Sequence, residues 1–339
     1  MGQEIQKLFM KQNLSEMEMT MIANQMFCGE LSEIEITAIL MALKLKGETL
    51  EEMSALARIM QNVALKIPYD KTDAMDNCGT GGDKSNTFNI STTSAFVLAA
   101  GGIKMAKHGN RSVSSRSGSA DVCRELGIEM TLRPDEMAYL LENVGIAFLF
   151  APHVHPNMKY VMNVRKTLQT PTIFNLIGPM TNPLPLKAQL MGIYRRDLLQ
   201  ETARALGKLG RERAVVVNGA GYMDEATLLG ENHIALYAEG EVKELTFSPE
   251  DVGLKRTSKE KIQGGNAREN SLILKRVLNN EKGAYLDTVL LNAGLGFFAY
   301  GKVSTIEEGV LMARKIVASG EAKQKLAELL AAQQEVLVG

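Results

Sequence analysis

The chain has 339 residues, of which 45% are hydrophobic and 23% are charged, and its formal net charge is −1. This balance is typical of a soluble globular protein and gives no general attraction to nucleic acid or to a membrane surface. No apolar run approaches the roughly 20 residues of a transmembrane helix, and the first residues lack the pattern of a signal peptide. The three cysteines (Cys28, Cys78 and Cys123) are far apart, which argues against a disulfide framework or a zinc site and favours a reducing cytoplasm.

The first seventy residues predict helices alone. Three capping boxes occur in a row, in which a hydroxyl accepts from an early backbone N–H and a glutamate reaches back to the cap. The pairs are Ser15 with Glu18, Ser32 with Glu35, and Thr49 with Glu52. Short amphipathic helices need a packing partner, so we expect a small all-helical domain over residues 1–70 that packs on itself or on a second chain.

From residue 71 onward, apolar strand-like runs alternate with helical segments. Residues 145–150, 214–217 and 289–294 are candidate buried strands, and residues 198–209 form a candidate helix. This alternation predicts an α/β domain over residues 71–339 with a central, mainly parallel sheet flanked by helices. Residues 163–185 contain four prolines and interrupt this alternation of strands and helices. We expect this segment to cross back to the helical domain.

Two segments indicate a phosphate ligand. The first, residues 76–83, reads DNCGTGGD, and hydroxyl-rich residues 87–93 follow it at the start of an apolar helical run. Glycines let backbone N–H groups approach phosphate oxygens, and a helix N-terminus attracts anions. A tight turn before a capped helix would also explain this segment alone.

The second segment, residues 107–121, collects cations, hydroxyls and small residues in fifteen positions. A solvated loop could have this composition, but no amphipathic or alternating charge pattern accounts for it. Lysine supplies a point charge for phosphate, while serines and backbone N–H groups supply directional donors. Together the two segments predict a large, multiply charged phosphate ligand.

At this point the sequence resembles a known family, the anthranilate phosphoribosyltransferases. The matching segments span nearly the whole chain: 79–83, 86–92, 107–121, 164–166, 172–179, 223–225 and, more weakly, 264–266. The resemblance implies a small helical domain joined to a large α/β domain, an active site in the cleft between them, and a homodimer formed through the helical domain. It also implies transfer of the phosphoribosyl group of phosphoribosyl diphosphate (PRPP) to the amine of anthranilate.

Site residues follow from the resemblance position by position. Those matching PRPP-binding positions are Gly79, Gly82, Asp83, Thr87, Asn89, Ile90, Ser91, Thr92, Lys107, His108, Gly109, Asn110, Arg111, Ser112, Val113, Ser114, Ser115 and Ser119. Those matching anthranilate-binding positions are Gly79, Asn110 and Arg165, with His108 beside them. Those matching magnesium-binding positions are Ser91, Asp224 and Glu225, for up to two Mg²⁺ ions per chain.

The implied chemistry suits these residue types. Adjacent carboxylates suit a hard cation that keeps some waters, and an arginine fork suits the carboxylate of anthranilate. The aryl amine is already neutral at pH 7, so positioning and charge stabilisation are expected to dominate without a covalent enzyme intermediate. The sequence departs from the family pattern in two places: at Gln169 and Pro171, beside the predicted acceptor entrance, and over residues 218–222, just before the predicted metal pair.

Other interpretations stay open at this stage. A pyrimidine nucleoside phosphorylase would share a glycine-rich loop and a Lys-His-Gly segment, but residues 110–115 favour the transferase. A catalytically silent relative that binds nucleic acid would carry a basic surface and damaged motifs, unlike this chain. We interpret His153 and His155 as parts of a structural turn and Cys78 as a packed side chain, not as metal ligands or a nucleophile.

Overall fold

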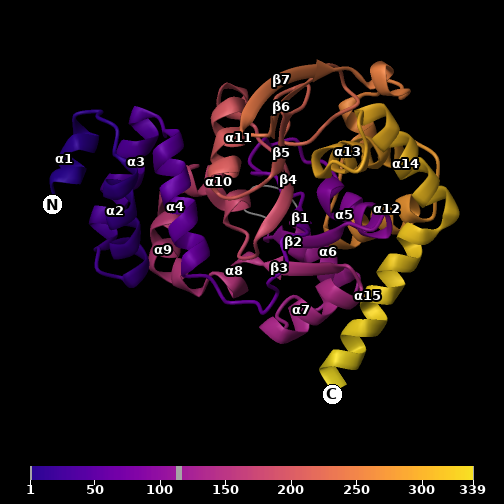
Figure 1. Ribbon diagram of the computed structural model, residues 1–339, viewed down its shortest axis with the longest axis horizontal. Coiled ribbons are helices and arrows are strands. Elements are labelled where there is room, and N and C mark those ends of the chain that lie inside the picture. Colours follow the sequence, from indigo (N-terminus) through magenta and orange to yellow (C-terminus); the bar gives the residue numbers. More distant parts are fainter. Residues whose placement is uncertain (1, 112–116, 339) are drawn as a thin grey trace.

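A computed structural model describes residues 2–111 and 117–338 and shows a group of helices beside a central sheet that further helices cover (Figure 1). The N-terminal helices are α1 (Gln3–Phe9), α2 (Glu16–Cys28), α3 (Glu33–Lys46) and α4 (Leu50–Asn62). All three predicted capping boxes are confirmed, because both reciprocal hydrogen bonds are present at the start of α2, α3 and α4. Apolar side chains of these helices are buried together, as their spacing predicted.

The sheet has seven strands in the order β3-β2-β1-β4-β5-β6-β7. The strands are β1 (Ala74–Asp76), β2 (Lys104–Gly109), β3 (Ile146–Phe150), β4 (Leu186–Gly192), β5 (Arg213–Asn218), β6 (Asn232–Ala238) and β7 (Glu241–Phe247). Strands β1 to β5 pair in parallel, whereas β6 and β7 are antiparallel. The predicted fold class is therefore confirmed, and two predicted strands correspond to β3 and β5.

One predicted strand is wrong. Residues 289–294 lie in the middle of helix α13 (Ala284–Tyr300), whose central residues are all buried. A helix that is apolar on every side and a strand that is buried on both faces give the same short apolar run. The length of α13 and its burial among other helices, rather than any local pattern, make this segment helical.

Two hydrophobic clusters lie on opposite faces of the sheet. Successive side chains of a strand point to opposite faces, so Ala214 and Val216 of β5 join the cluster with α1–α4, while Val215 and Val217 join the other. The helices of the α/β part are α5 (Ile90–Ala100), α6 (Ser119–Glu125), α7 (Pro134–Asn143), α8 (Ala151–Val154), α11 (Leu199–Lys208), α12 (Ala267–Leu278), α14 (Ile306–Ser319) and α15 (Glu321–Val338).

Helices α9 (Lys159–Leu168) and α10 (Ile173–Ile177) lie on the side of the N-terminal helices (Figure 1). Their buried residues, among them Val161, Val164 and Phe174, share the cluster of α2, α3 and α4. The polypeptide therefore returns to these helices after β3 before it enters β4. Over residues 2–111 and 117–338, no helix combines the length and apolarity needed to cross a membrane.

Candidate substrate and metal site

The glycine-rich segment follows β1 at the point where the order of strands reverses. From β1 the chain builds the sheet outward through β2 and β3, and then returns to add β4 on the other side of β1. In open parallel sheets such a reversal leaves a crevice at the carboxyl ends of the strands, where ligands bind. The loop after β1 is tied to the end of β4, because the Thr80 N–H donates to the Gly192 carbonyl oxygen at 2.9 Å.

Glycines at this crevice make room for Asp224. A Cβ atom added to Gly79 would lie 2.7 Å from Asp224 Oδ2, and one added to Gly192 would lie 1.6 Å from the Asp224 carbonyl oxygen. The Gly81 N–H donates to Asp224 Oδ2 at 2.5 Å, and both Gly81 and Gly82 have positive φ angles of 65° and 83°. The two predicted segments, 79–83 and 223–225, therefore meet in space although they are far apart in sequence.

Three carboxylates gather where these segments meet. Asp83 Oδ2 accepts from the Asp224 N–H at 3.4 Å. Burial, followed by the charge of Asp83, raises the pKa of Asp224 to about 7. Burial, followed by the charge of Asp224, raises the pKa of Glu225 to about 8, although the Lys107 ammonium and the Ser91 N–H oppose this rise. Like charges held this close favour a cation among them.

These residues fit Mg²⁺ as part of a ligand set rather than a complete one. Within the described residues, no group of three or more His, Cys, Asp or Glu side chains is arranged to enclose a metal ion. Mg²⁺ is usually bound by one or two carboxylates and completed by waters and substrate phosphates. The donor chemistry of Asp224, Glu225 and the Ser91 hydroxyl matches that pattern.

Helix α5 begins at the same place without a side-chain cap. Its N-cap residue, Asn89, makes no side-chain hydrogen bond to the helix. The first N–H groups of a helix need a partner and carry a partial positive charge, so an anion can take the place of the cap. Of the predicted residues here, Ile90 is buried in the core, Thr87 pairs with Gln263, and Ser91 and Thr92 stand in the first turn.

Several buried polar atoms around the crevice have no hydrogen-bond partner among the described residues. They are Asn77 Oδ1, Thr80 Oγ1, Thr92 Oγ1 and His108 Nε2. A native structure rarely leaves such groups unpaired, so their gathering at one site supports a polar ligand there. Asn77 and Thr80 are absent from the predicted site, although both lie within the glycine-rich segment and could have been included on that ground.

Strand β2 supplies Lys107 and His108, successive residues near its carboxyl end. Lys107 is only 1% exposed, and its Nζ atom lies 3.4 Å from the His108 carbonyl oxygen. Burial lowers the pKa of His108 well below its usual value, and its ring stands 5.2 Å from the ring of His155. His155 is therefore a packing partner of a predicted site residue, while His153 bonds to the Leu132 carbonyl oxygen at 2.9 Å.

A buried carboxylate that sequence reasoning missed holds the end of β2 in place. Asp76 Oδ1 accepts from the His108 N–H at 3.2 Å, and Asp76 Oδ2 accepts from Asn182 Nδ2 at 3.0 Å. Asn182 Nδ2 also donates to the Ala106 carbonyl oxygen at 2.8 Å. Asp76 and Asn182 are both fully buried and lie 106 positions apart, so no local pattern reveals their pairing.

The loop after β2 is tied together at its two ends. Ser119 Oγ accepts from the Asn110 N–H at 3.1 Å, and the Ala120 N–H donates to the Asn110 carbonyl oxygen at 3.2 Å. A Cβ atom at Gly109 would lie 2.5 Å from Ser119 Oγ, so the close approach requires glycine. Arg111 lies over the ring of Phe150. The predicted residues Ser112, Val113, Ser114 and Ser115 lie outside the described residues.

The predicted anthranilate arginine comes from α9. The Arg165 guanidinium lies 5.3 Å from the centre of the Phe174 ring, and burial lowers its pKa. Among the described ion pairs, none includes Arg165. Gln169 ends α9 with φ 47°, a conformation that favours glycine, and the Pro171 carbonyl oxygen accepts from Lys44 at 2.8 Å.

Cys78 does not have the character of a nucleophile. Burial raises the pKa of its thiol to about 12, so it stays protonated at neutral pH.

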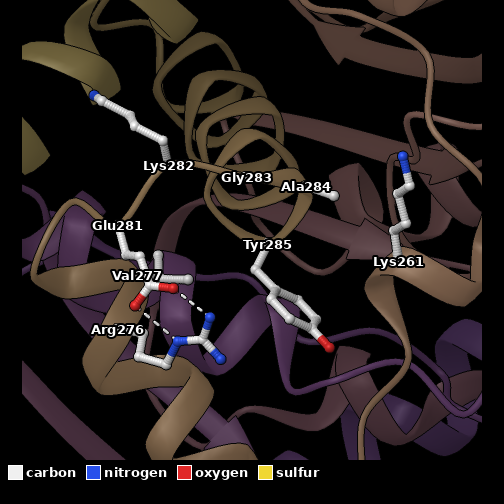
Figure 2. A pocket seen from close by; sticks show the side chains of 8 residues that line it. All are labelled: Lys261, Arg276, Val277, Glu281, Lys282, Gly283, Ala284 and Tyr285. Atoms are coloured by element: carbon white, nitrogen blue, oxygen red, sulfur yellow. Dashed lines mark hydrogen bonds and ion pairs between the residues drawn. The ribbon is translucent and has the colours of Figure 1, made fainter.

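A separate surface pocket of about 250 Å³ surrounds the start of α13 (Figure 2). Its charged side chains are exposed, Arg276 is paired with Glu281, and none of the predicted site residues lines it. The crevice at the strand ends is therefore the candidate site.

Comparisons with known proteins agree with this geometry. Residues 3–64 match the "Glycosyl transferase family, helical bundle domain", and residues 71–323 match the "Glycosyl transferase family, a/b domain". The chain therefore has the architecture of this class of transferase, with its helical and α/β parts in the same order.

Individual relatives narrow the class. Anthranilate phosphoribosyltransferase of Listeria monocytogenes serotype 4a is 67% identical over 98% of this chain and 98% of its own. The solved structure of the enzyme of that name from Thermus thermophilus has a TM-score of 0.93 and 39% identity, covering 98% of this chain and 100% of its own. The Saccharomyces cerevisiae enzyme in complex with PRPP and Mg has a TM-score of 0.87 at 24% identity over 98% and 97%, which shows a common fold. The chain belongs to the anthranilate phosphoribosyltransferase family.

Proposed function

We propose that this protein transfers the 5-phosphoribosyl group of PRPP to the amine of anthranilate. The products are N-(5-phosphoribosyl)anthranilate and diphosphate, and the reaction is the second step of tryptophan biosynthesis from chorismate. The observation that carries this proposal is the meeting of the glycine loop, the uncapped start of α5 and the Asp224–Glu225 pair. The names of the close relatives support the same reaction.

The PRPP-binding residues in this proposal surround that meeting point. Glycine-loop N–H groups and the first turn of α5 donate to phosphate oxygens, and the buried Lys107 adds a positive charge. The unpaired Thr92 hydroxyl finds its partner in the substrate. Asn110 and Ser119, which are joined by a hydrogen bond, would add donors to the same ligand.

Ser91, Asp224 and Glu225 would hold magnesium, with up to two ions per chain. When bound, Mg²⁺ would neutralise the charge of the diphosphate. The two carboxylates contribute by their position, because the glycines at 79 and 192 let Asp224 come directly against the loop. The raised pKa values of Asp224 and Glu225 supply the electrostatic reason for taking up a cation.

Anthranilate would bind between α9 and the end of β2. The Arg165 fork suits its carboxylate, and Gly79, His108 and Asn110 complete the proposed acceptor site. His108 is kept neutral by burial, so it offers a hydrogen-bonding ring without repelling other cations. A neutral aryl amine needs no strong base before it attacks.

The chemical step is a substitution at C1 of the ribose. The bond from C1 to the diphosphate oxygen breaks and its electron pair leaves with diphosphate, while the amine lone pair forms the new C1–N bond. The nitrogen then loses one proton to solvent or to diphosphate. The protein's contribution is to align the amine with C1 and to stabilise the departing negative charge.

To test this proposal, purified protein is mixed with anthranilate, PRPP and Mg²⁺. The loss of anthranilate fluorescence and the release of diphosphate are then measured together. Both signals are expected to require all three components. Phosphorolysis of thymidine or uridine without PRPP turnover would instead favour a nucleoside phosphorylase. Salt-dependent DNA binding without PRPP affinity would favour a nucleic-acid-binding role.

We also propose a homodimer, with residues 1–70 as the helical domain and 71–339 as the α/β domain, joined near residues 163–185. Large apolar side chains are exposed on α1–α3 and the residues beside them: Phe9, Met10, Met17, Met21, Ile34 and Leu45. Such a concentration suits a surface covered by a second copy. Measuring the sedimentation of the purified protein tests whether it is a dimer.

All three cysteines are free, which suits the reducing cytoplasm that we propose as the location of this protein.

A further inference from the structure

Asn270 of α12 reaches the substrate-binding segment from 181 positions away in the sequence. It is 2% exposed and uses both ends of its side-chain amide. Its Nδ2 atom donates to Asn89 Oδ1 at 2.8 Å, and its Oδ1 atom accepts from the Gly265 N–H at 2.8 Å. A buried side chain satisfied at both ends has a single orientation.

This arrangement sets the orientation of the Asn89 amide as well. A backbone N–H can only donate, so Gly265 requires the oxygen of Asn270, and the Asn270 nitrogen must face Asn89. Asn89 therefore presents its own oxygen to Asn270 and keeps its nitrogen for other acceptors. At the far end, Asn89 Nδ2 lies 3.4 Å from the Ser117 carbonyl oxygen, which can only accept. Backbone groups thus specify the direction of both amides.

The orientation directs the Asn89 oxygen toward α12, and α5 has no side-chain cap. Asparagine is one of the best N-cap residues because its oxygen accepts from the first free N–H groups of a helix. In this protein that oxygen is taken by Asn270, and Asn89 makes no side-chain bond to its own helix. The start of α5 is therefore left open to an anion.

The residues behind Asn270 are packed against residues 86–89. The Gly264 N–H donates to the Asn86 carbonyl oxygen at 2.9 Å, and a Cβ atom at Gly264 would lie 2.7 Å from the backbone of Phe88. Tyr285, visible in Figure 2, packs its ring 4.9 Å from that of Phe88 and donates to the Gln263 carbonyl oxygen at 2.8 Å. Residues 86–89 and 262–270 therefore form one packed unit.

We propose that Asn270 is a positioning residue for the phosphate-bearing substrate. It holds Asn89 with its NH₂ group available to the substrate and its oxygen turned away, and so keeps the first turn of α5 uncapped for phosphate. This role rests on the proposed function, because it concerns how PRPP is bound.

The test is a double-mutant cycle of Asn270→Ala, Asn89→Ala and both together. Asn270→Ala releases Asn89 to cap its own helix in competition with phosphate, so the KM for PRPP rises roughly ten- to a hundredfold, as expected for hydrogen bonds to a charged group. The KM for anthranilate stays unchanged. In the Asn89→Ala background, adding Asn270→Ala has no further effect on the KM for PRPP. Calorimetric titration with PRPP and Mg²⁺ without anthranilate should repeat the loss as weaker binding.

Gln333→Ala is the matched control. Gln333 is another buried side-chain amide that joins a helix to a loop, accepting from the Glu129 N–H at 3.1 Å, and it belongs to α15. It should lower thermal stability about as much as Asn270→Ala and leave both KM values unchanged. If Asn270→Ala does not fold, Asn270→Ser leaves a hydroxyl at this buried position but is too short to hold Asn89, and it carries the same prediction.

The outcomes separate this inference from the proposed function. A wild-type protein that neither binds PRPP nor releases diphosphate would overturn the proposed function. An active wild-type protein in which Asn270→Ala leaves the KM for PRPP unchanged, changes both KM values equally, or adds fully to Asn89→Ala would overturn the positioning role alone.

Discussion

The starts of α2, α3 and α4 differ from the start of α5 in how their free N–H groups are satisfied. In the first three helices, Ser15, Ser32 and Thr49 each accept from the third residue of the helix. In α5, the side chain of Asn89 is directed instead to Asn270. Local sequence caps the N-terminal helices, whereas the start of α5 has no side-chain cap and is completed by a bound phosphate in our proposal.

The same difference holds for buried charge. In the N-terminal region, Lys46 and the fully buried Glu52 form an ion pair at 2.9 Å, and Glu52 also accepts from the Leu14 N–H. At the crevice, Asp224 and Glu225 take part in none of the described ion pairs, and both have raised pKa values. One region pairs its buried charges, whereas the other leaves two buried carboxylates outside the described ion pairs, where in our proposal they bind a cation.

The largest effect is expected when the buried carboxylates of Asp224 and Glu225 are neutralised. Asp224→Asn together with Glu225→Gln should lower turnover by at least about a hundredfold, the scale of a lost electrostatic contribution to catalysis. Thermal stability at pH 8 should hold or rise, since burial and mutual repulsion already disfavour the charged pair. A magnesium titration of the rate and a thermal melt give both values.

An equivalent pair serves as the control for that prediction. Glu250 and Asp251 are also adjacent acids but are exposed, so Glu250→Gln with Asp251→Asn should leave turnover unchanged. Wild-type magnesium dependence in the Asp224–Glu225 variant would refute the metal assignment.

A smaller effect is expected at the acceptor side. Arg165→Ala should raise the KM for anthranilate by roughly ten- to a hundredfold, because it removes a charged hydrogen-bonding fork. The KM for PRPP should remain near its wild-type value. Steady-state kinetics with each substrate varied in turn measure both KM values. The control is Lys166→Ala, which changes an exposed neighbour. Unchanged anthranilate kinetics would rule out the carboxylate role.

Acid should destabilise the protein through the buried histidines. Burial lowers the pKa of His155 to about 4, below the usual value near 6.5. As pH falls from about 6.5 to about 4, His155 binds a proton in the unfolded chain but stays neutral in the folded protein. The free energy of unfolding therefore decreases by up to about 3 kcal/mol. In chemical denaturation, His155→Gln should reduce the decrease in the free energy of unfolding between pH 6.5 and 4. The control His233→Gln should leave that decrease unchanged. Equal slopes in all three proteins would contradict this account.

The smallest effect is expected at a cap. Ser32→Ala should cost about 1 kcal/mol of stability without changing either KM, because its hydroxyl serves only its own helix. Asn89→Ala should instead raise the KM for PRPP, and the stability that it loses should come from the buried Asn270 amide left without its partner, not from a lost cap. Denaturant unfolding and kinetics of the two variants compare the regions directly. An unchanged KM for PRPP in Asn89→Ala, or a raised one in Ser32→Ala, would remove the contrast.

The sequence by itself determined the features that depend on near neighbours. The capping boxes join residues three apart, strands β3 and β5 are continuous apolar runs, and the glycine-rich segment carries its turns within a few positions. These patterns also placed the chain in its fold class. They failed at residues 289–294, where burial on every side erased the periodicity that separates a helix from a strand.

Only the tertiary structure decided which distant residues complete the site. The contacts of Asp224 with Gly79 and Gly192, of Asp76 with Asn182, and of Asn89 with Asn270 join residues from 32 to 181 positions apart. The contacts of Asp224 and Asp76 arise because the strand order β2-β1-β4-β5 brings separate loops together, and that of Asn89 arises because α12 packs beside α5. A hydrogen bond acts over about 3 Å, and at such sequence separations the path of the whole chain decides whether two side chains come within that reach.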